Sequence, residues 1–260
     1  MIQVRLQHFL HPASSARTII KKLASPEEAF RAKHARGAPV ELREWAAVYP
    51  DNFFTSLEYL ELDPEFVRLS QSLHVANYVG VTVREMWNIY NWVRRTRSVP
   101  GDAAEVGVYK GASAKIICEV KGERRLHLFD TFKGLPDTDS TIDTFKKGDM
   151  AGNSLEQVRA YLSEYPKLEF YEGIFPDSAR QLAETPVRFS FVHLDVDIYS
   201  ATFACLSFFY PRMPRGAALL SHDYRSFNCR GVKKAFDQFF ADKPEPIIEL
   251  WDTQALIIKQ

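Results

Sequence analysis

The chain has 260 residues, of which 46% are hydrophobic, and its 33 basic and 33 acidic side chains cancel to a formal net charge of zero. This composition argues against a disordered chain, and the lack of a basic excess argues against nucleic acid or an anionic membrane as a partner, so we expect a small molecule. Three widely spaced cysteines, a start unlike a signal peptide and no apolar run of about 18 residues together predict a cytoplasmic protein without a membrane span.

The first hundred residues are predicted to be helical and irregular, and we assign residues 1–99 to a helical extension or cap. Helix starts are indicated at Pro26 and over 63–65, where proline and acidic residues suit a first turn. A further helix is expected over 83–95, because Met86 and Ile89 share one face with other apolar residues. The aromatic side chains of this region are expected to pack in a core, cover the substrate or form the interface of a homo-oligomer, a dimer or higher assembly.

From residue 100 onward, short apolar strands alternate with helices. The predicted strands are 103–108, 126–129, 168–171, 189–194, 217–220, 247–250 and 255–258, and the predicted helices are 112–120, 155–162, 177–183, 200–209 and 231–240. Asp177 and Ser178 are expected to cap the third of these helices. The alternation predicts an α/β fold with a mostly parallel seven-stranded sheet covered on both faces. The last two strands lack a helix between them and predict an antiparallel edge.

A glycine-containing turn joins the first of these strands to its helix. Gly107 and Gly111 lie in that turn, directly after Glu105. Glycines there let a ligand approach the backbone, and the helix start offers free N–H groups. The spacing is not GxGxxG, so the usual dinucleotide fingerprint is absent. Taken alone, the turn indicates a structural role as readily as a cofactor site.

An acidic residue at the end of the second strand makes a cofactor site the better interpretation. Asp130 follows Gly107 at roughly the twenty-residue spacing at which an acid accepts hydrogen bonds from ribose hydroxyls. Because the pyrophosphate fingerprint is missing, S-adenosylmethionine (SAM) fits this pair as well as or better than NAD. We therefore predict that residues 100–260 form a Rossmann-like, SAM-binding catalytic domain.

Acidic residues also follow the fourth and fifth strands of this region. Asp195 and Asp197 come after strand 189–194, and His222 and Asp223 come after strand 217–220. If these strands are neighbours, Asp195, His222 and Asp223 could hold a divalent metal, and carboxylate oxygens suit Mg²⁺. Asp197 could then take a proton from a substrate hydroxyl.

The same residues leave other interpretations open. The acids could be solvated turn residues, and His222 could be structural. An Asp-x-Asp pair at a strand end could also hold the metal and nucleotide sugar of a glycosyltransferase, and a non-catalytic SAM-binding protein is a third hypothesis. The polar stretch 137–153 is long for a strand-to-helix loop and is predicted to be a lid. Cys229, in the loop after the fifth strand, could lie near a site, but we identify no partner that would support thiol chemistry.

Six short motifs in a fixed order extend this interpretation. They are EVGVYKGA at 105–112, FDTFKGLP at 129–136, GIFPDS at 173–178, LDVDIY at 194–199, YPRMPRG at 210–216 and HDY at 222–224. From about residue 77 to the C-terminus the sequence resembles the TylF-like, or macrocin O-methyltransferase, family. The resemblance implies a class I methyltransferase fold and SAM-dependent, Mg²⁺-assisted methylation of a hydroxyl on a sugar or other natural product.

The resemblance also implies roles for individual residues. It implies cofactor contacts by Asn77, Tyr78, Glu105, Gly107, Tyr109, Asp130, Thr131, Phe132, Gly173, Ile174 and Asp195, metal binding by Asp195, His222 and Asp223, and a catalytic base at Asp197. The sequence departs from the family in one place. The family commonly has two acids before the tyrosine, and here the first is His222. An imidazole suits Mg²⁺ less well than a carboxylate does, which leaves open another divalent metal or no metal requirement.

Overall fold

The structure, a computed structural model, describes residues 63–75 and 80–260. The described residues contain a seven-stranded sheet in the order β3-β2-β1-β4-β5-β7-β6. Its strands are β1 Asp102–Val106, β2 Leu126–Asp130, β3 Leu168–Glu172, β4 Phe189–Leu194, β5 Ala218–Ser221, β6 Ile248–Glu249 and β7 Ala255–Ile258. The pairs among β1 to β5 are parallel, whereas β7 is antiparallel to both β5 and β6. The predicted sheet and its antiparallel edge are confirmed.

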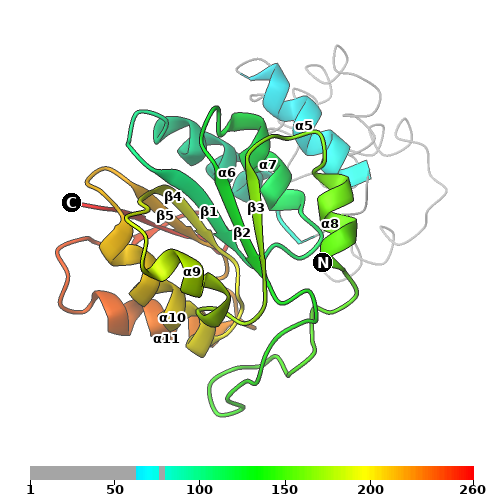
Figure 1. The fold of residues 1–260 in the computed structure, drawn as a ribbon. Helices are drawn as coiled ribbons and strands as arrows, with labels where there is room; N and C mark the ends of the chain where they lie inside the picture. The colour runs from blue at the N-terminus through cyan, green and yellow to red at the C-terminus, as the bar shows by residue number, and fades with distance from the viewer. Residues whose placement is uncertain (1–62, 76–79) are drawn as a thin grey trace, which may run out of the picture. The chain divides into compact units, whose positions relative to one another are not determined.

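Helices cover both faces of this sheet (Figure 1). One face carries α6 Val83–Arg95, α7 Ala112–Val120 and α8 Leu155–Tyr161, and the other carries α9 Arg180–Ala183, α10 Tyr199–Phe209 and α11 Arg230–Phe240. Short 3-10 helices, η3 Asp177–Ala179 and η4 Tyr210–Arg212, precede α9 and follow α10. Aromatic rings fill the space between the sheet and α10, where Phe175 stacks on Phe209 with centroids 5.5 Å apart. This packing fixes the carboxyl ends of the strands, where ligands bind in folds of this kind.

Two helices precede the sheet in the described residues. Helix α5 spans Pro64–Val75, and Asp63 Oδ1 accepts a hydrogen bond from Phe66 N, so the predicted start is confirmed. Helix α6 starts with a capping box, in which Thr82 and Glu85 each accept a hydrogen bond from the other's backbone N–H. Residues 73–260 form one compact unit, so α6 belongs with the sheet. The assignment of residues 1–99 to a cap stays a prediction.

Two local predictions were wrong. Strand β1 ends at Val106 rather than at residue 108, because Gly107 turns the chain with φ of 87°. The side chains of Asp177 and Ser178 do not cap a helix, since both lie inside η3 with Pro176 at its cap position. The Asp177 carboxylate pairs with Arg180 Nη2 at 2.8 Å instead.

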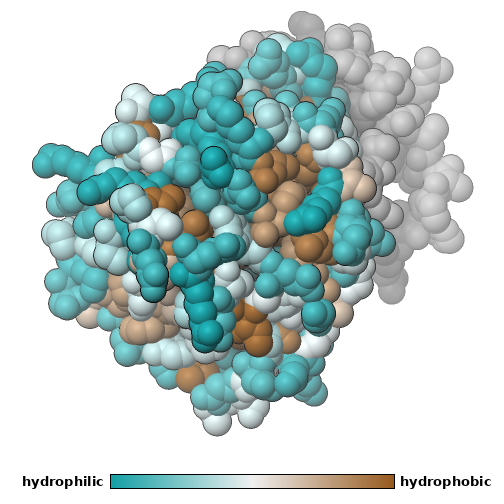
Figure 2. Space-filling view, viewed as in Figure 1, coloured by the Kyte–Doolittle hydropathy of each residue, from teal (hydrophilic) through white to brown (hydrophobic). Residues whose placement is uncertain are grey.

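The exterior is consistent with the balanced composition. On the face seen in Figure 2, hydrophilic residues divide the apolar ones into small patches. None of the helices within residues 63–75 and 80–260 has the length and apolar character needed to cross a bilayer.

A buried acid of the segment 137–153 ties this segment to the sheet domain. Asp143 is 7% exposed, and its Oδ1 accepts a hydrogen bond from Tyr199 N, the first residue of α10, at 2.9 Å. Ile198, which precedes that helix, has no side chain that could serve as a cap. A residue from a distant loop therefore satisfies the helix terminus and ties the loop to the residues that follow β4.

Replacing Asp143 with alanine is expected to lower the free energy of unfolding by about 1 kcal/mol, the usual cost of losing a helix cap. Urea unfolding followed by circular dichroism measures this change. The matched control is Asp137→Ala in the same segment, because Asp137 is 86% exposed and pairs only with Lys147 in the described contacts. A control that costs as much as Asp143→Ala would show that the cap contributes nothing specific.

Candidate functional site

A cavity of about 410 Å³ opens at the carboxyl ends of the parallel strands. This volume lies in the range of small-molecule sites. Most of the predicted site residues contribute to its wall, namely Gly107, Tyr109, Asp130, Thr131, Gly173, Ile174, Asp195, Asp197, His222 and Asp223. Residues from the ends of β1, β2, β3, β4 and β5 therefore meet at one place, as their positions at strand ends predict.

The glycine turn and Asp130 form one hydrogen-bonded unit. Asp130 Oδ2 accepts hydrogen bonds from Val108 N and Tyr109 N, each at 2.8 Å, and Oδ1 accepts one from Phe132 N at 2.7 Å. A carboxylate has about four acceptor sites, so Asp130 keeps capacity for a ligand hydroxyl. The Gly107 turn is obligatory, because a Cβ there would lie 1.7 Å from the carbonyl oxygen of Asp195. This close approach brings the ends of β1 and β4 together.

Two of the predicted cofactor residues do not line the cavity. Glu105 is fully buried below the cavity, where Oε1 lies 2.8 Å from His193 Nδ1 and burial raises the pKa of the carboxyl. Phe132 is buried, at 6% exposure. Neither side chain contributes to the cavity wall. Asn77 and Tyr78 lie outside the described residues. Cofactor contacts by these four residues stay predictions.

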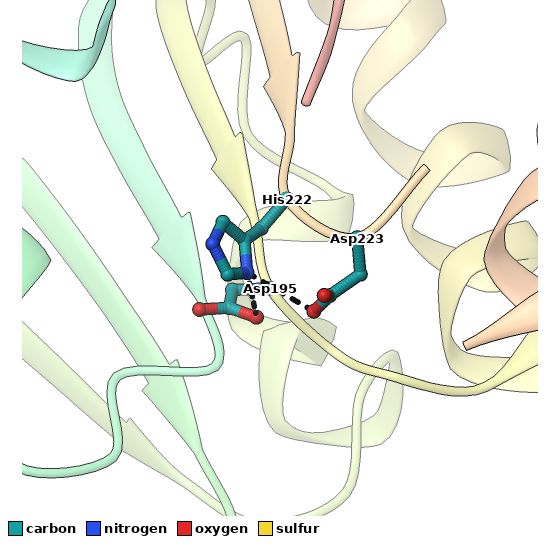
Figure 3. Close-up of side chains that lie close together, drawn as sticks. All are labelled: Asp195, His222 and Asp223. Atoms are coloured by element: carbon teal, nitrogen blue, oxygen red, sulfur yellow. Dashed lines mark hydrogen bonds and ion pairs between the residues drawn. The ribbon is translucent and has the colours of Figure 1, made fainter. Parts of the chain in front are cut away.

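Asp195, His222 and Asp223 converge at the ends of β4 and β5 (Figure 3). His222 Nδ1 lies 3.2 Å from Asp195 Oδ1 and 3.0 Å from Asp223 Oδ2. The three side chains each offer a ligand atom, and these atoms lie within 4.8 Å of one another. The backbone sets this arrangement, because His222 N donates to Leu194 O at 2.8 Å and continues the pairing of the two strands. The predicted proximity of these residues is confirmed.

Negative charges in this cluster and burial have opposite effects on the pKa of His222. Burial alone would lower the pKa of the imidazole, but the carboxylates of Asp195, Asp223 and Glu85 outweigh it and raise the pKa well above its ordinary value. The contact with Glu85 comes from the other side of the ring, where His222 Nε2 lies 3.3 Å from Glu85 Oε2. The imidazole therefore has carboxylates at both nitrogens.

Asp197 stands beside this cluster in the cavity wall. Its backbone is left-handed, with φ of 60°, a conformation that aspartate and asparagine adopt more readily than most residues. Burial and the negative charges of Asp195 and Asp223 raise the pKa of Asp197 to about 8. Cys229 Sγ donates to Asp197 Oδ1 at 3.7 Å.

Sequence reasoning missed Glu85 as a neighbour of the site and Asp197 as a partner of Cys229. Cys229 lies in the loop after β5, and its distance from Asp197 depends on how that loop folds back. Glu85 is recognisable as a capping-box residue from its spacing to Thr82. No local signal shows that the start of α6 lies beside the end of β5.

Comparison with known families identifies the region that carries these features. A profile of the family described as macrocin-O-methyltransferase (TylF) matches residues 75–256, more than half of the chain. The chain belongs to the macrocin O-methyltransferase (TylF) family. The six motifs that suggested this family lie inside the matched residues, and so do all of the residues that we assign to the site.

Individual TylF-like relatives agree with this assignment. An 8-demethyl-8-(2,3-dimethoxy-alpha-L-rhamnosyl)-tetracenomycin-C 4'-O-methyltransferase of Streptomyces olivaceus is 30% identical over 149 residues, which cover 51% of this chain and 56% of the relative. A demethyldecarbamoylnovobiocin O-methyltransferase of Streptomyces niveus is 26% identical over 161 residues, which cover 55% and 60%. The chain thus matches little more than half the length of these relatives.

A solved structure supports the fold. The O-methyltransferase NovP superposes with a TM-score of 0.61 at 23% sequence identity, covering 68% of this chain and 80% of NovP. The class I methyltransferase fold expected from the sequence is therefore confirmed.

Proposed function

We propose that this chain is a SAM-dependent O-methyltransferase that methylates a hydroxyl group of a sugar or another natural product. The observation that carries the proposal is the cavity in which Asp130, at a nucleoside-binding position, faces the same space as Asp195, Asp197 and Asp223. Membership of the TylF family, together with relatives named as methyltransferases of natural products, favours methyl transfer over the glycosyl transfer that Asp195 and Asp197 alone left open.

The residues present fit SAM. Asp130 keeps acceptor capacity for ribose hydroxyls, and the exposed side chains of Tyr109 and Ile174 offer apolar surface at the cavity wall. Gly107 contributes to the cavity wall, and the carbonyl oxygen of Asp195 occupies the place that a Cβ would take there. We assign the nucleoside to this side of the cavity and the acceptor to the side of Asp197 and Asp223.

The residues present also fit a divalent metal. Two carboxylates and one imidazole nitrogen within 4.8 Å are a donor set that metals accept. We propose that Asp195, His222 and Asp223 hold this ion. When bound, the metal would lower the pKa of an acceptor hydroxyl and orient it.

The chain's own acids then complete the transfer. In its ionised form Asp197, whose pKa of about 8 leaves a part of the protein ionised near neutral pH, takes the proton of the acceptor hydroxyl. The oxygen attacks the methyl carbon of SAM in line with the leaving sulfur. One O–C bond forms, one S–C bond breaks, and the sulfur leaves as S-adenosylhomocysteine (SAH). The positive charge of the sulfonium is lost in this step, so exclusion of water favours the reaction. Segment 137–153, which contributes Phe145 and Met150 to the wall, is our candidate for that role.

Labelled SAM tests the proposal with a panel of sugars, glycosides and phenols. We expect label in at least one acceptor. We also expect loss of most turnover after chelation, which removes the ion, and in Asp195→Ala, which removes one of its proposed ligands. Activity that persists under both treatments would exclude the metal mechanism but leave methyl transfer standing. Binding of SAH without turnover of any acceptor would support a non-catalytic SAM-binding protein instead.

A further inference from the structure

His222 lies between carboxylates on both sides of its ring. Nδ1 faces Asp195 and Asp223 in the cavity, whereas Nε2 lies 3.3 Å from Glu85 Oε2 on the opposite side. The side chain of His222 is only 9% exposed, and that of Glu85 is 3% exposed. Nε2 makes no hydrogen bond among the described residues, and the Glu85 carboxylate at 3.3 Å is the acidic group that faces it.

Glu85 is held in place independently of the cavity. Its Oε2 accepts a hydrogen bond from Thr82 N at 2.9 Å through the capping box of α6. Its Oε1 accepts one from Thr253 Oγ1 at 2.6 Å, in the turn between β6 and β7. The start of one helix and the turn of the closing hairpin thus fix a carboxylate behind His222, which makes the ring orientation a property of the fold.

The arrangement of Glu85 and His222 resembles the surroundings of metal-binding histidines in other proteins. A ligating imidazole usually donates its second ring N–H to a carboxylate, which fixes the tautomer and makes the ligating nitrogen more basic. Because metal ligands must be deprotonated, an ion would displace the proton on Nδ1; with the remaining proton on Nε2 toward Glu85, the lone pair of Nδ1 would point at the space between Asp195 and Asp223. The cluster then has nitrogen as well as oxygen ligands, and imidazole nitrogen favours transition-series ions, whereas Mg²⁺ prefers oxygen.

We propose that Glu85 is a positioning residue which, through His222, makes the Asp195–Asp223 site a mixed nitrogen–oxygen site that prefers a transition-series ion such as Mn²⁺ to Mg²⁺. This inference rests on the metal site of the proposed function. It concerns which ion the site takes and which residue outside the cavity wall sets that preference.

Metal titration of the full chain, stripped of metal beforehand, tests the proposal without any acceptor. Calorimetry is expected to show tighter binding of Mn²⁺ than of Mg²⁺. Glu85→Gln keeps a side chain that suits a capping box but removes the charge, and it is expected to weaken Mn²⁺ binding by about 10- to 100-fold. In pulsed electron paramagnetic resonance, the Mn²⁺-loaded protein is expected to show nitrogen coupling that His222→Asp abolishes.

Asp252→Asn is the matched control. Asp252 lies in the same turn as Thr253, and its Oδ2 accepts a hydrogen bond from Thr82 Oγ1. Among the described residues, no hydrogen bond or ion pair joins Asp252 to His222. This variant is expected to bind Mn²⁺ as the wild type does. Equal affinities for the two ions, or equal behaviour of Glu85→Gln and Asp252→Asn, would overturn the proposal.

SAH titration of the same samples separates this inference from the proposed function. If SAH binds but neither ion does, the metal site is wrong and methyl transfer still stands. If the wild type does not bind SAH, the proposed function itself fails, whatever the metal titrations show.

Discussion

Replacing Asp197 with asparagine is expected to lower kcat for methyl transfer about 10²- to 10⁴-fold, the usual contribution of a positioned acid or base. Asparagine keeps the size of the side chain and tolerates the left-handed backbone at this position, where φ is 60°. It cannot take up the acceptor's proton. Initial rates with labelled SAM at saturating acceptor measure the change, and calorimetry with SAH is expected to show little change in cofactor binding.

The control for this variant is another aspartate with the same backbone geometry. Asp252 has φ of 67° and does not contribute to the cavity wall, so Asp252→Asn makes the same chemical change away from the site. Its kcat is expected to stay close to that of the wild type. A loss below tenfold in Asp197→Asn, or a matching loss in Asp252→Asn, would remove Asp197 from the role of base.

Much of the fold follows from patterns that are local in the sequence. Alternation of apolar strands with helices specifies the parallel sheet, and the closing strands without a helix between them specify the antiparallel edge. Helix ends are predictable where a cap residue carries them, as at Asp63. The end of β1 was misplaced because Val108 continues the apolar pattern, while the turn is set by Gly107 and its contact with Asp195.

In the candidate site, too, some residue positions follow from local sequence patterns and others depend on tertiary packing. Asp195, His222 and Asp223 are predictable because residues that directly follow adjacent parallel strands must lie at one edge of the sheet. Glu85 and Asp143 are not, because each reaches its place through a loop or helix whose position depends on tertiary packing. Glu105 is a different case, because the motif that suggests a cofactor contact does not show that the side chain is buried against His193. Its contact with the cofactor stays a prediction.

Replacing Gly107 with alanine is expected to have the largest effect on the architecture of the site. The added methyl group would lie 1.7 Å from the carbonyl oxygen of Asp195, which is backbone and cannot rotate away as a side chain could. The ends of β1 and β4 would have to separate, although Asp195 N donates to Val106 O at 2.9 Å across them. Left-handed strain and overpacking together predict a loss of about 2–5 kcal/mol in the free energy of unfolding.

Gly148→Ala separates these two contributions. Gly148 has φ of 86°, close to the 87° of Gly107, but a Cβ there would meet no atom within 4 Å. This variant should therefore carry only the left-handed strain, about 1–2 kcal/mol. Urea unfolding of both variants gives the difference, and SAH calorimetry is expected to show binding retained in Gly148→Ala and lost in Gly107→Ala. Equal destabilisation with SAH binding intact in both would mean that the approach of Gly107 to Asp195 does not shape the cofactor site, because strain alone would then account for the whole effect.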